Sequence, residues 1–380
     1  MGKFGKKVSI SIDPVDYNIT ICGESGIGKT TLAKETCEKL VGDEGYIHFD
    51  IGRERGADAI EGIVSEHIGD WAKLTEVVDD IVENKESDYP ALKVIIWDTL
   101  DELILLAEAE SIRQYNKKQS SIPNGRKVDT IDAAWAGFGR GQAYAIELIL
   151  NVFDKLNNVG ISNFIVAHVK RTDIVDPVSQ ETYSKLTADT TQKYFNAIKN
   201  KQHFIALAYI DRDIVKEKTG RKNVATKEDI TISKAVKESR VISFRDDTYS
   251  VDSKSRFAEI VDRIPFDTDE FIKAMTDAII AEKTKNGKTI TEAQKEQKVR
   301  DKAKADKAEL FSKQAKADKA VAELEENRQN YLDTISTSFS SADADLKAKA
   351  KELLTNTGCK KFSDPELPIE ALKEIAELFA

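Results

Sequence analysis

Eight consecutive residues near the start of this chain have the types and spacing needed to bind phosphate. The segment Gly23-Glu-Ser-Gly-Ile-Gly-Lys-Thr30 fits the pattern G-x-x-x-x-G-K-[ST]. Its glycines let backbone N–H groups turn inward around a β-phosphate, and the start of a following helix favours negative charge there. We expect Lys29 to contact the β- and γ-phosphates and the Thr30 hydroxyl to coordinate Mg²⁺. The predicted nucleotide-binding residues are Gly23, Glu24, Ser25, Gly26, Ile27, Gly28, Lys29, Thr30 and Thr31.

A carboxylate suited to the same site follows an apolar segment about seventy residues later. Asp98 ends the run Lys93-Val-Ile-Ile-Trp-Asp98, which matches the Walker B pattern, where an acid holds the Mg²⁺ shell through water. The alternatives are that Asp98 caps the next helix and that the glycine loop is accidental. Together the two segments predict a site for ATP and Mg²⁺, with Lys29 and Asp98 among the catalytic residues.

Three more residues are candidates for roles in hydrolysis. Asp98 is followed by Thr99 and not by an acid, which is also the case in RecA-like sequences. In that group the residue that orients the attacking water lies just past the second strand. We favour Glu54 over Asp50 for this role. His168 ends another apolar run and is expected to sense the γ-phosphate. Surface ion pairs for the two acids, and a structural role for the histidine, are the alternatives.

A pair of cations suggests that the site is shared between subunits. Lys254-Ser-Arg256-Phe257 is similar to the Lys-x-Arg element that RecA-like ring and filament ATPases insert into a neighbour's nucleotide site, where it stabilises charge on the transferring phosphoryl group. We therefore expect Lys254 and Arg256 to bind nucleotide in a homo-oligomer, ring or filament. A solvated basic turn is the alternative.

Cations and aromatic rings alternate between residues 112 and 140, and further cations follow His168. Cations for phosphates and rings for stacking are the ingredients of single-stranded DNA binding. A long surface loop with Tyr115 and Trp135 packed down is the alternative. Lys170 opens a polar stretch, predicted to be a mobile loop, that ends at Asn200. The predicted DNA-binding residues are Arg113, Lys117, Lys118, Arg126, Lys127, Phe138, Arg140, Lys170 and Arg171.

These residues need strands and helices to bring them together. Apolar runs at 17–22, 46–50, 93–98, 162–168 and 203–210 alternate with helical patterns, which predicts an α/β P-loop fold with a RecA-like, mostly parallel sheet. We expect this core to span residues 1–266. Residues 267–335 are predicted to be a helical linker with an imperfect heptad pattern, or a solvated single helix. Residues 336–380 are predicted to form a small helical module.

Composition bounds the class of protein. Of the 380 residues, 41% are apolar and 32% charged, and the formal net charge of -9 argues against an indiscriminate polycation. The cysteines Cys22, Cys37 and Cys359 have no paired spacing, which indicates a reducing compartment. No apolar run has membrane-spanning length and the N-terminus lacks a signal-peptide core, so we expect a cytoplasmic protein, in the host cytoplasm if a phage encodes it.

Several motifs in this order resemble one known group. They are Gly23–Thr31, Val94–Thr99, Gly137–Gly141, Ala167-His168-x-Lys170 and Lys254-x-Arg256-Phe257. The chain resembles phage nucleotide-binding proteins with a RecA-like AAA domain, including the Sak-type single-strand annealing ATPases. The resemblance covers roughly the first two-thirds of the chain. It implies ATP and Mg²⁺ binding, single-stranded DNA binding and annealing during phage recombination, with a single-strand DNA-binding protein as a further partner.

The motifs and the resemblance together predict an ATPase, stimulated by DNA, that binds single-stranded DNA and acts in recombination or annealing. Two other functions stay open: a replicative helicase-like motor or helicase loader, and a nucleotide switch without DNA contact. The sequence does not distinguish annealing from strand exchange or translocation, nor a ring from a filament.

Overall fold

The computed structural model describes residues 9–53, 55–175, 178–222, 229–245, 253–285, 287 and 289–379. It divides into two compact units, Met1–Glu309 and Leu310–Ala380. Among the described residues, every strand belongs to the first unit and the second is helical. No helix of the described part of the chain is long and apolar enough to cross a membrane.

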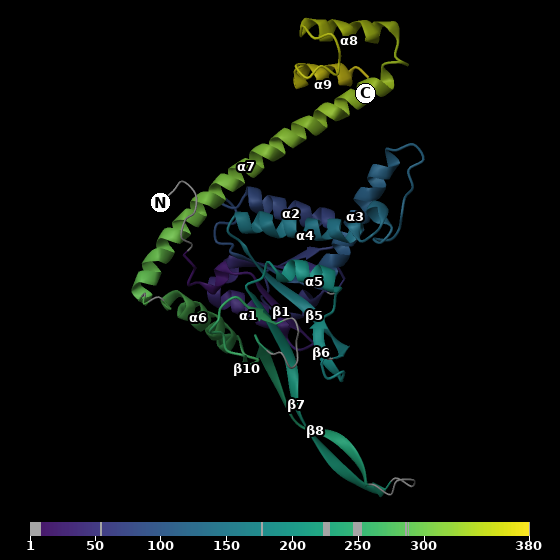
Figure 1. Ribbon diagram of the computed structural model, residues 1–380. Coiled ribbons are helices and arrows are strands. Elements are labelled where there is room, and N and C mark those ends of the chain that lie inside the picture. The colour runs from purple at the N-terminus through teal and green to yellow at the C-terminus, as the bar shows by residue number, and fades with distance from the viewer. Residues whose placement is uncertain are drawn as a thin grey trace. The chain divides into compact units, whose positions relative to one another are not determined.

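A mostly parallel sheet forms the centre of the first unit (Figure 1). The strand order is β10-β8-β7-β1-β5-β4-β2-β3, with β6 added to β5 and β9 added to β7. Neighbours from β7 to β3 are parallel, and β6, β8, β9 and β10 pair antiparallel. The strands are β1 (Ile19–Gly23), β2 (Tyr46–Ile51), β3 (Ser65–Ile68), β4 (Val94–Asp98), β5 (Ser162–Val175), β6 (Thr182–Ala188), β7 (Phe204–Lys222), β8 (Asp229–Ser243), β9 (Lys254–Ser255) and β10 (Arg263–Pro265).

Helices cover both faces of this sheet (Figure 1). The α-helices are α1 (Lys29–Val41), α2 (Trp71–Glu83), α3 (Leu100–Ser120), α4 (Arg140–Asn158), α5 (Gln192–Lys199), α6 (Thr268–Thr284), α7 (Ile290–Ser338), α8 (Ala344–Asn356) and α9 (Ile369–Glu377). Single 3₁₀ turns occupy Pro14–Asp16, Asp43–Gly45, Gly56–Ala59 and Ala134–Ala136.

Strand β4 shows why the core segments are apolar throughout. Ile96 lies in a cluster with Leu32 of α1 and Phe271 of α6. The next residue, Trp97, points to the other face, where its ring contacts Phe153 of α4 with centroids 5.0 Å apart. Both side-chain rows of a parallel strand are buried when helices cover both faces, so the sequence lacks a polar alternation here. The predicted α/β fold with a mostly parallel sheet and a helical C-terminal extension is confirmed.

One segment differs from its prediction. The polar stretch from Lys170 to Asn200 was expected to be a loop, but β5 continues to Val175 and pairs antiparallel with β6 before α5 begins. The register runs without interruption from Val169↔Ala188 to Val175↔Thr182. A two-stranded hairpin needs no apolar face of its own, so its pattern looked like a polar loop.

The second unit has a core of its own. The end of α7 contributes Ile335, α8 contributes Leu354, and α9 contributes Leu372 and Ile375, all buried together. Leu367, which precedes α9, closes the cluster. Arg328 donates hydrogen bonds to the carbonyl oxygens of Leu367 and Asp364 and so ties the connecting segment to α7.

His203, just before β7, makes the stability of the first unit depend on pH. Its Nδ1 accepts a hydrogen bond from the backbone N–H of Asn18 at 3.1 Å. Burial, and then the charges of Arg256 and Lys254, lower the pKa of His203 to about 4. The unfolded ring binds a proton near pH 6.5, so between pH 6.5 and 4 the unfolded chain holds a proton that the folded chain excludes.

We expect acid to weaken the fold through this ring. The free energy of unfolding should fall by on the order of 1–2 kcal/mol as pH drops from about 6.5 to 4, a range that allows for solvent screening of a partly exposed group. Urea denaturation at several pH values measures this free energy, with His203→Asn as the control, because the amide oxygen can accept a hydrogen bond but does not titrate. Equal pH slopes for the two proteins would contradict the assignment.

Candidate functional site

Strand β1 and helix α1 are joined by a loop whose backbone requires glycine. Gly26 and Gly28 have φ values of 75° and 107°, in the left-handed region that side chains rarely adopt. At Gly23 a Cβ would lie 2.8 Å from the carbonyl oxygen of Ala208. Ile27, 2% exposed, anchors the loop in the core.

The first turn of α1 is left open to an anion. Its N-cap is Gly28, and none of the side chains that the structure describes caps the helix. The N–H groups of a first helical turn have no partner within the helix, and the helix dipole favours negative charge beside them. The glycine loop and the start of α1 therefore have the features of an anion-binding site.

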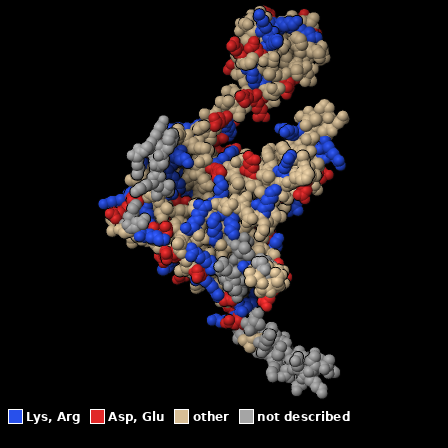
Figure 2. All heavy atoms as spheres, in the orientation of Figure 1, with Lys and Arg blue, Asp and Glu red and all other residues tan. Residues whose placement is uncertain are grey.

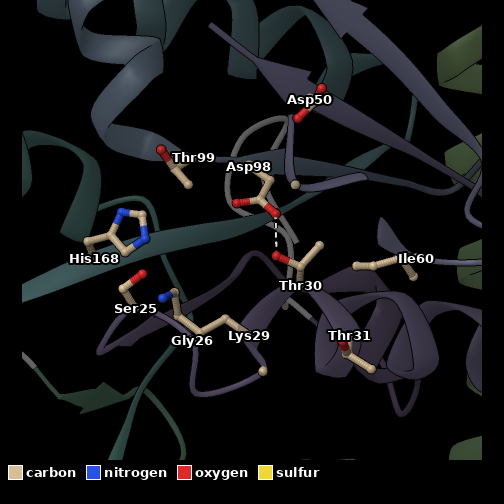
Figure 3. A pocket seen from close by; sticks show the side chains of 12 residues that line it. Ser25, Gly26, Lys29, Thr30, Thr31, Asp50, Ile60, Asp98, Thr99 and His168 are labelled. Carbon is tan, nitrogen blue, oxygen red and sulfur yellow. Dashed lines mark hydrogen bonds between the residues drawn. The ribbon is translucent and has the colours of Figure 1, made fainter. Parts of the chain in front are cut away.

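A cavity of about 270 Å³ lies in front of this helix end (Figure 3). It is built at the carboxyl ends of β1, β2 and β4 and beside His168, midway along β5. The carboxyl ends of parallel strands are the usual ligand position in open α/β sheets. The lining residues of the cavity are Ser25, Gly26, Gly28, Lys29, Thr30, Thr31, Asp50, Gly56, Ile60, Asp98, Thr99 and His168. The structure therefore brings the predicted loop, Asp98 and His168 into one pocket.

The Lys29 ammonium is held inside the loop. The residue is 6% exposed, and its Nζ donates to the carbonyl oxygens of Gly23 and Glu24, each at 3.0 Å. These neutral carbonyls orient the charge without cancelling it. A phosphate oxygen, which is charged, would be a stronger acceptor.

Asp98 receives two hydrogen bonds on one oxygen. Thr30 Oγ1 lies 2.6 Å from Asp98 Oδ2 (Figure 3), and His48 Nε2 lies 3.2 Å from the same atom. Burial raises the pKa of Asp98, but the hydrogen bonds from His48 and Thr30 and the charge of Lys29 outweigh it, so the pKa is lowered overall. The carboxylate is therefore ionised at neutral pH.

His48 is a contact that sequence reasoning missed. It is fully buried on β2, and its Nδ1 lies 3.0 Å from Ser65 Oγ. An ionised carboxylate only accepts, so Nε2 of His48 carries a proton toward Asp98. Thr99, with Oγ1 3.5 Å from the Glu102 N–H, is the N-cap of α3, which leaves Asp98 available to the pocket.

These residues fit a magnesium nucleotide. Within the described ranges no group of three or more His, Cys, Asp or Glu side chains could hold a metal alone. Mg²⁺ at phosphate sites is commonly held by one or two protein ligands together with phosphate oxygens and water. Thr30 and Asp98 would hold it here, and the bound ion would neutralise charge on the phosphates.

His168 sits between the loop and the Walker B strand because β5 lies between β1 and β4. It pairs in register with Gly23. Asp101 in the first turn of α3 accepts from its backbone N–H at 3.1 Å and contacts its Nδ1 at 3.0 Å. Asp101 Oδ1 is buried, and among the described residues it has no hydrogen-bond partner. Asp101 was not foreseen, since nothing in the sequence signals this contact.

Of the two candidate bases, the structure describes only Asp50. Asp50 is 5% exposed, lines the pocket, and has Oδ2 3.2 Å from His67 Nδ1. It is in register with Asp98 on the neighbouring strand. Glu54, the favoured base, lies outside the described residues, so its role stays a prediction.

The structure does not bring Lys254 and Arg256 to this chain's own pocket. Strand β9 pairs with the start of β7, where Ser255 is opposite Phe204, whereas the phosphate loop follows the other end of β1. Lys254 Nζ donates to the Lys199 carbonyl at 3.2 Å and Arg256 to the Asn200 carbonyl at 2.5 Å. Burial and the charge of Arg256 lower the pKa of Lys254.

A different arginine lies beside the loop. Arg240 of β8 donates to the Ile27 carbonyl oxygen at 3.5 Å. It was missed because its position depends on β8 pairing antiparallel with β7, far along the chain from the glycines.

The predicted DNA-binding residues fall in two places. Lys170 and Arg171 lie on the exposed part of β5, where Lys170 pairs with Asp189 at 3.3 Å. The others lie at the end of α3, in the loop after it, or at the start of α4. Arg113 is bound by both oxygens of Glu110 at 2.6 and 2.7 Å. The exposed cations of this second group are Arg113, Lys117, Lys118, Arg126, Lys127 and Arg140.

The aromatic residues of this region are of two kinds, packed and exposed. Trp135 packs between Tyr115 and Tyr144, with ring centroids 5.8 and 4.5 Å away, and the Lys118 ammonium lies 5.7 Å from its ring. Phe138 is 100% exposed. Tyr115 and Trp135 are therefore packed down, and Phe138 presents its ring to solvent.

A family profile described as "AAA domain" matches residues 16–257. The chain belongs to this AAA domain family. The match covers the segments that contain the phosphate loop, Asp98 and His168, so the pocket lies within this domain, which supports nucleotide binding and ATPase activity in general. The chain is also similar to "SPbeta prophage-derived uncharacterized protein YorG" of Bacillus subtilis (strain 168), with 27% identity over 150 residues. That alignment covers 40% of this chain and 40% of that protein.

Asp101 should position His168 rather than bind nucleotide. We expect Asp101→Asn to lower kcat for ATP hydrolysis by about tenfold or more, as loss of an orienting partner commonly does, while the ATP dissociation constant stays within about threefold. Glu102→Gln, in the same helical turn, controls for the change in helix-end charge. Steady-state hydrolysis and equilibrium nucleotide binding measure the two quantities, and an unchanged kcat for Asp101→Asn would refute the role.

Proposed function

We propose that this AAA-domain protein is an ATPase that binds single-stranded DNA and acts in recombination or annealing, in the manner of phage proteins. The name of the prophage relative and the resemblance to Sak-type ATPases support the phage setting. The single observation that carries DNA binding is the loop between α3 and α4, which exposes Phe138 beside cations.

This loop has an unusual backbone. Trp135, Ala136 and Phe138 have φ values of 58°, 69° and 54°, and Gly137 and Gly139 have 74° and 71°. Side-chain-bearing residues in the left-handed region cost roughly 1–2 kcal/mol each, and such strain persists only where the surroundings hold it. Strain of this kind clusters at functional sites.

The surroundings do hold the loop. The Trp135 indole N–H donates to Ser111 Oγ of α3 at 3.1 Å. The Gly139 carbonyl accepts from Lys193 of α5 at 2.6 Å. The Ser111 hydroxyl also donates to the Gly141 carbonyl at 3.0 Å. Three helices thus fix the backbone that exposes Phe138.

The chemistry around Phe138 suits a single strand. An exposed ring can stack on a base of any identity, and lysines and arginines can contact the phosphates on either side. Helix α3 and the loop after it project from the body of the molecule (Figure 1), and Figure 2 shows Lys and Arg side chains on both sides of the end of this projection. The net charge of -9 does not oppose this, because the local arrangement of charges governs binding.

Helix α3 connects the two sites. Its first turn contains Asp101, which contacts His168 in the pocket, and its later turns carry Ser111 and Tyr115, which contact Trp135 of the loop. In the proposal, nucleotide in the pocket shifts the Asp101–His168 contact, and the helix carries this shift to Phe138. ATP thereby strengthens the grip on DNA and hydrolysis releases it.

Assembly is part of the proposal. Lys254 and Arg256 lie at the opposite end of the strands from the loop that holds Lys29. These two cations reach a phosphate only if this end of the sheet faces the pocket of a neighbouring subunit. We propose that ATP binds at such an interface, and that a single-strand DNA-binding protein is a further partner.

Removing the exposed ring tests the DNA contact. Phe138→Ala should weaken binding of a short labelled oligonucleotide in the presence of ATP by about five- to a hundredfold, since a stacked base contributes roughly 1–3 kcal/mol. Leu105→Ala, which removes a 56% exposed side chain on α3, outside the loop that carries Phe138, is the control. Fluorescence anisotropy over a salt series measures the affinity and the number of phosphate contacts.

The outcomes distinguish the competing functions. If the unchanged protein and Phe138→Ala bind the oligonucleotide with equal affinity, the loop is not part of the DNA interface. A chain without measurable affinity for single strands would favour a nucleotide switch. Unwinding of a forked duplex would favour a helicase-like motor.

Mixing two inactive proteins tests the shared site. Arg256→Ala keeps its own pocket, and Lys29→Ala keeps its cation for a neighbour. If Arg256 acts across an interface, each variant alone should lose ATPase activity by about tenfold or more, and mixtures should recover part of it. A mixture no more active than its components would exclude action in trans.

A further inference from the structure

The C-terminal unit, residues 310–380, contains a cavity whose lining includes none of the residues of the pocket at the phosphate loop. A cavity of about 570 Å³ opens between the end of α7 and the segment after α8. This size falls within the roughly 300–1,000 Å³ of ligand pockets. Its lining residues are Phe339, Lys351, Leu354, Thr355, Gly358, Cys359, Lys360, Lys361 and Phe362.

The floor of the cavity is apolar. Leu354 is 6% exposed and belongs to the core of the unit. The Phe339 and Phe362 rings meet edge to face with centroids 5.4 Å apart, and both residues, like Cys359, are only half-buried. The core of the unit is thus left open on this side, where a further apolar side chain can pack.

The rim of the cavity is basic. Lys351 lies on α8, and Lys360 and Lys361 follow the turn at Gly358, whose φ of 79° lets the chain reverse after the helix. All three lysines are exposed. Within the described part of the chain, no acidic side chain lines the cavity and none forms an ion pair with these ammonium groups.

We propose that this pocket docks an acidic amphipathic peptide segment of a partner protein. One or two bulky apolar side chains would fill the floor beside Phe339 and Phe362, and carboxylates on the flanking residues would pair with Lys351, Lys360 and Lys361. Aromatic and aliphatic anchors in a pocket supply most of the affinity, and rim charges select the partner and speed encounter. A nucleic acid would match the rim but leave the apolar floor unfilled.

Peptide binding to the full-length chain tests this site. The probe is a short fluorescein-labelled peptide rich in Asp and Glu with one Leu and one Phe. Two comparison peptides replace either the acidic residues by Lys or the Leu and Phe by Ser. We expect micromolar-range binding of the first peptide and losses of about tenfold or more for both others.

Variants locate the site. Lys360→Glu with Lys361→Glu should weaken binding of the acidic peptide by about tenfold or more. Lys349→Glu with Lys373→Glu makes the same change in charge on exposed residues outside the cavity and should leave binding within about twofold. Thr355→Glu places an acid in the cavity lining and should repel the peptide, and circular dichroism checks that each variant is folded.

Three results would overturn the proposal. Equal binding of the acidic peptide and its Ser-substituted form would show charge attraction without docking. Equal losses in the two lysine pairs would place the site elsewhere. Binding of a single-stranded oligonucleotide that is lost in Lys360→Glu with Lys361→Glu, together with no binding of the acidic peptide, would assign the rim to nucleic acid.

Discussion

Burial of the Asp98 carboxylate constrains the whole site. Taking a charged group out of water is costly unless hydrogen bonds and opposite charge compensate. The compensation comes from Thr30 on α1, His48 on β2 and the charge of Lys29. Two of these sit at the start of α1 and one on a neighbouring strand, so the register of β2 and β4 and the position of the phosphate loop are fixed together.

The parts of this arrangement that depend on local sequence could be predicted. The glycine loop requires left-handed residues at Gly26 and Gly28 and a following helix, and all of these are visible in the sequence. Asp98 and His168 each end an apolar run, and parallel strands have their carboxyl ends at the same edge of the sheet. Their proximity could therefore be predicted. The contacts of His48, Asp101 and Arg240 could not be predicted, because each depends on which strands are neighbours in the sheet.

The basic and aromatic region shows the same limit. Its composition correctly indicated rings among cations, but composition does not say which rings are packed. Trp135 is held by Ser111 and by two tyrosines, whereas Phe138 is turned outward by a run of left-handed residues. Three non-glycine residues of that run, Trp135, Ala136 and Phe138, adopt a conformation that neither propensity nor spacing predicts. The helical character of the segment that contains α7 was, in contrast, predicted from the sequence, but not the bounds Ile290–Ser338.

Strand β5 belongs to two parts of the molecule at once. Its first half is a central strand of the sheet and carries His168 at the pocket, and its second half is one side of the hairpin with β6. The strand runs unbroken for 14 residues from Ser162 to Val175. A displacement of the His168 imidazole would therefore be transmitted directly to the hairpin, because the two are parts of one continuous strand.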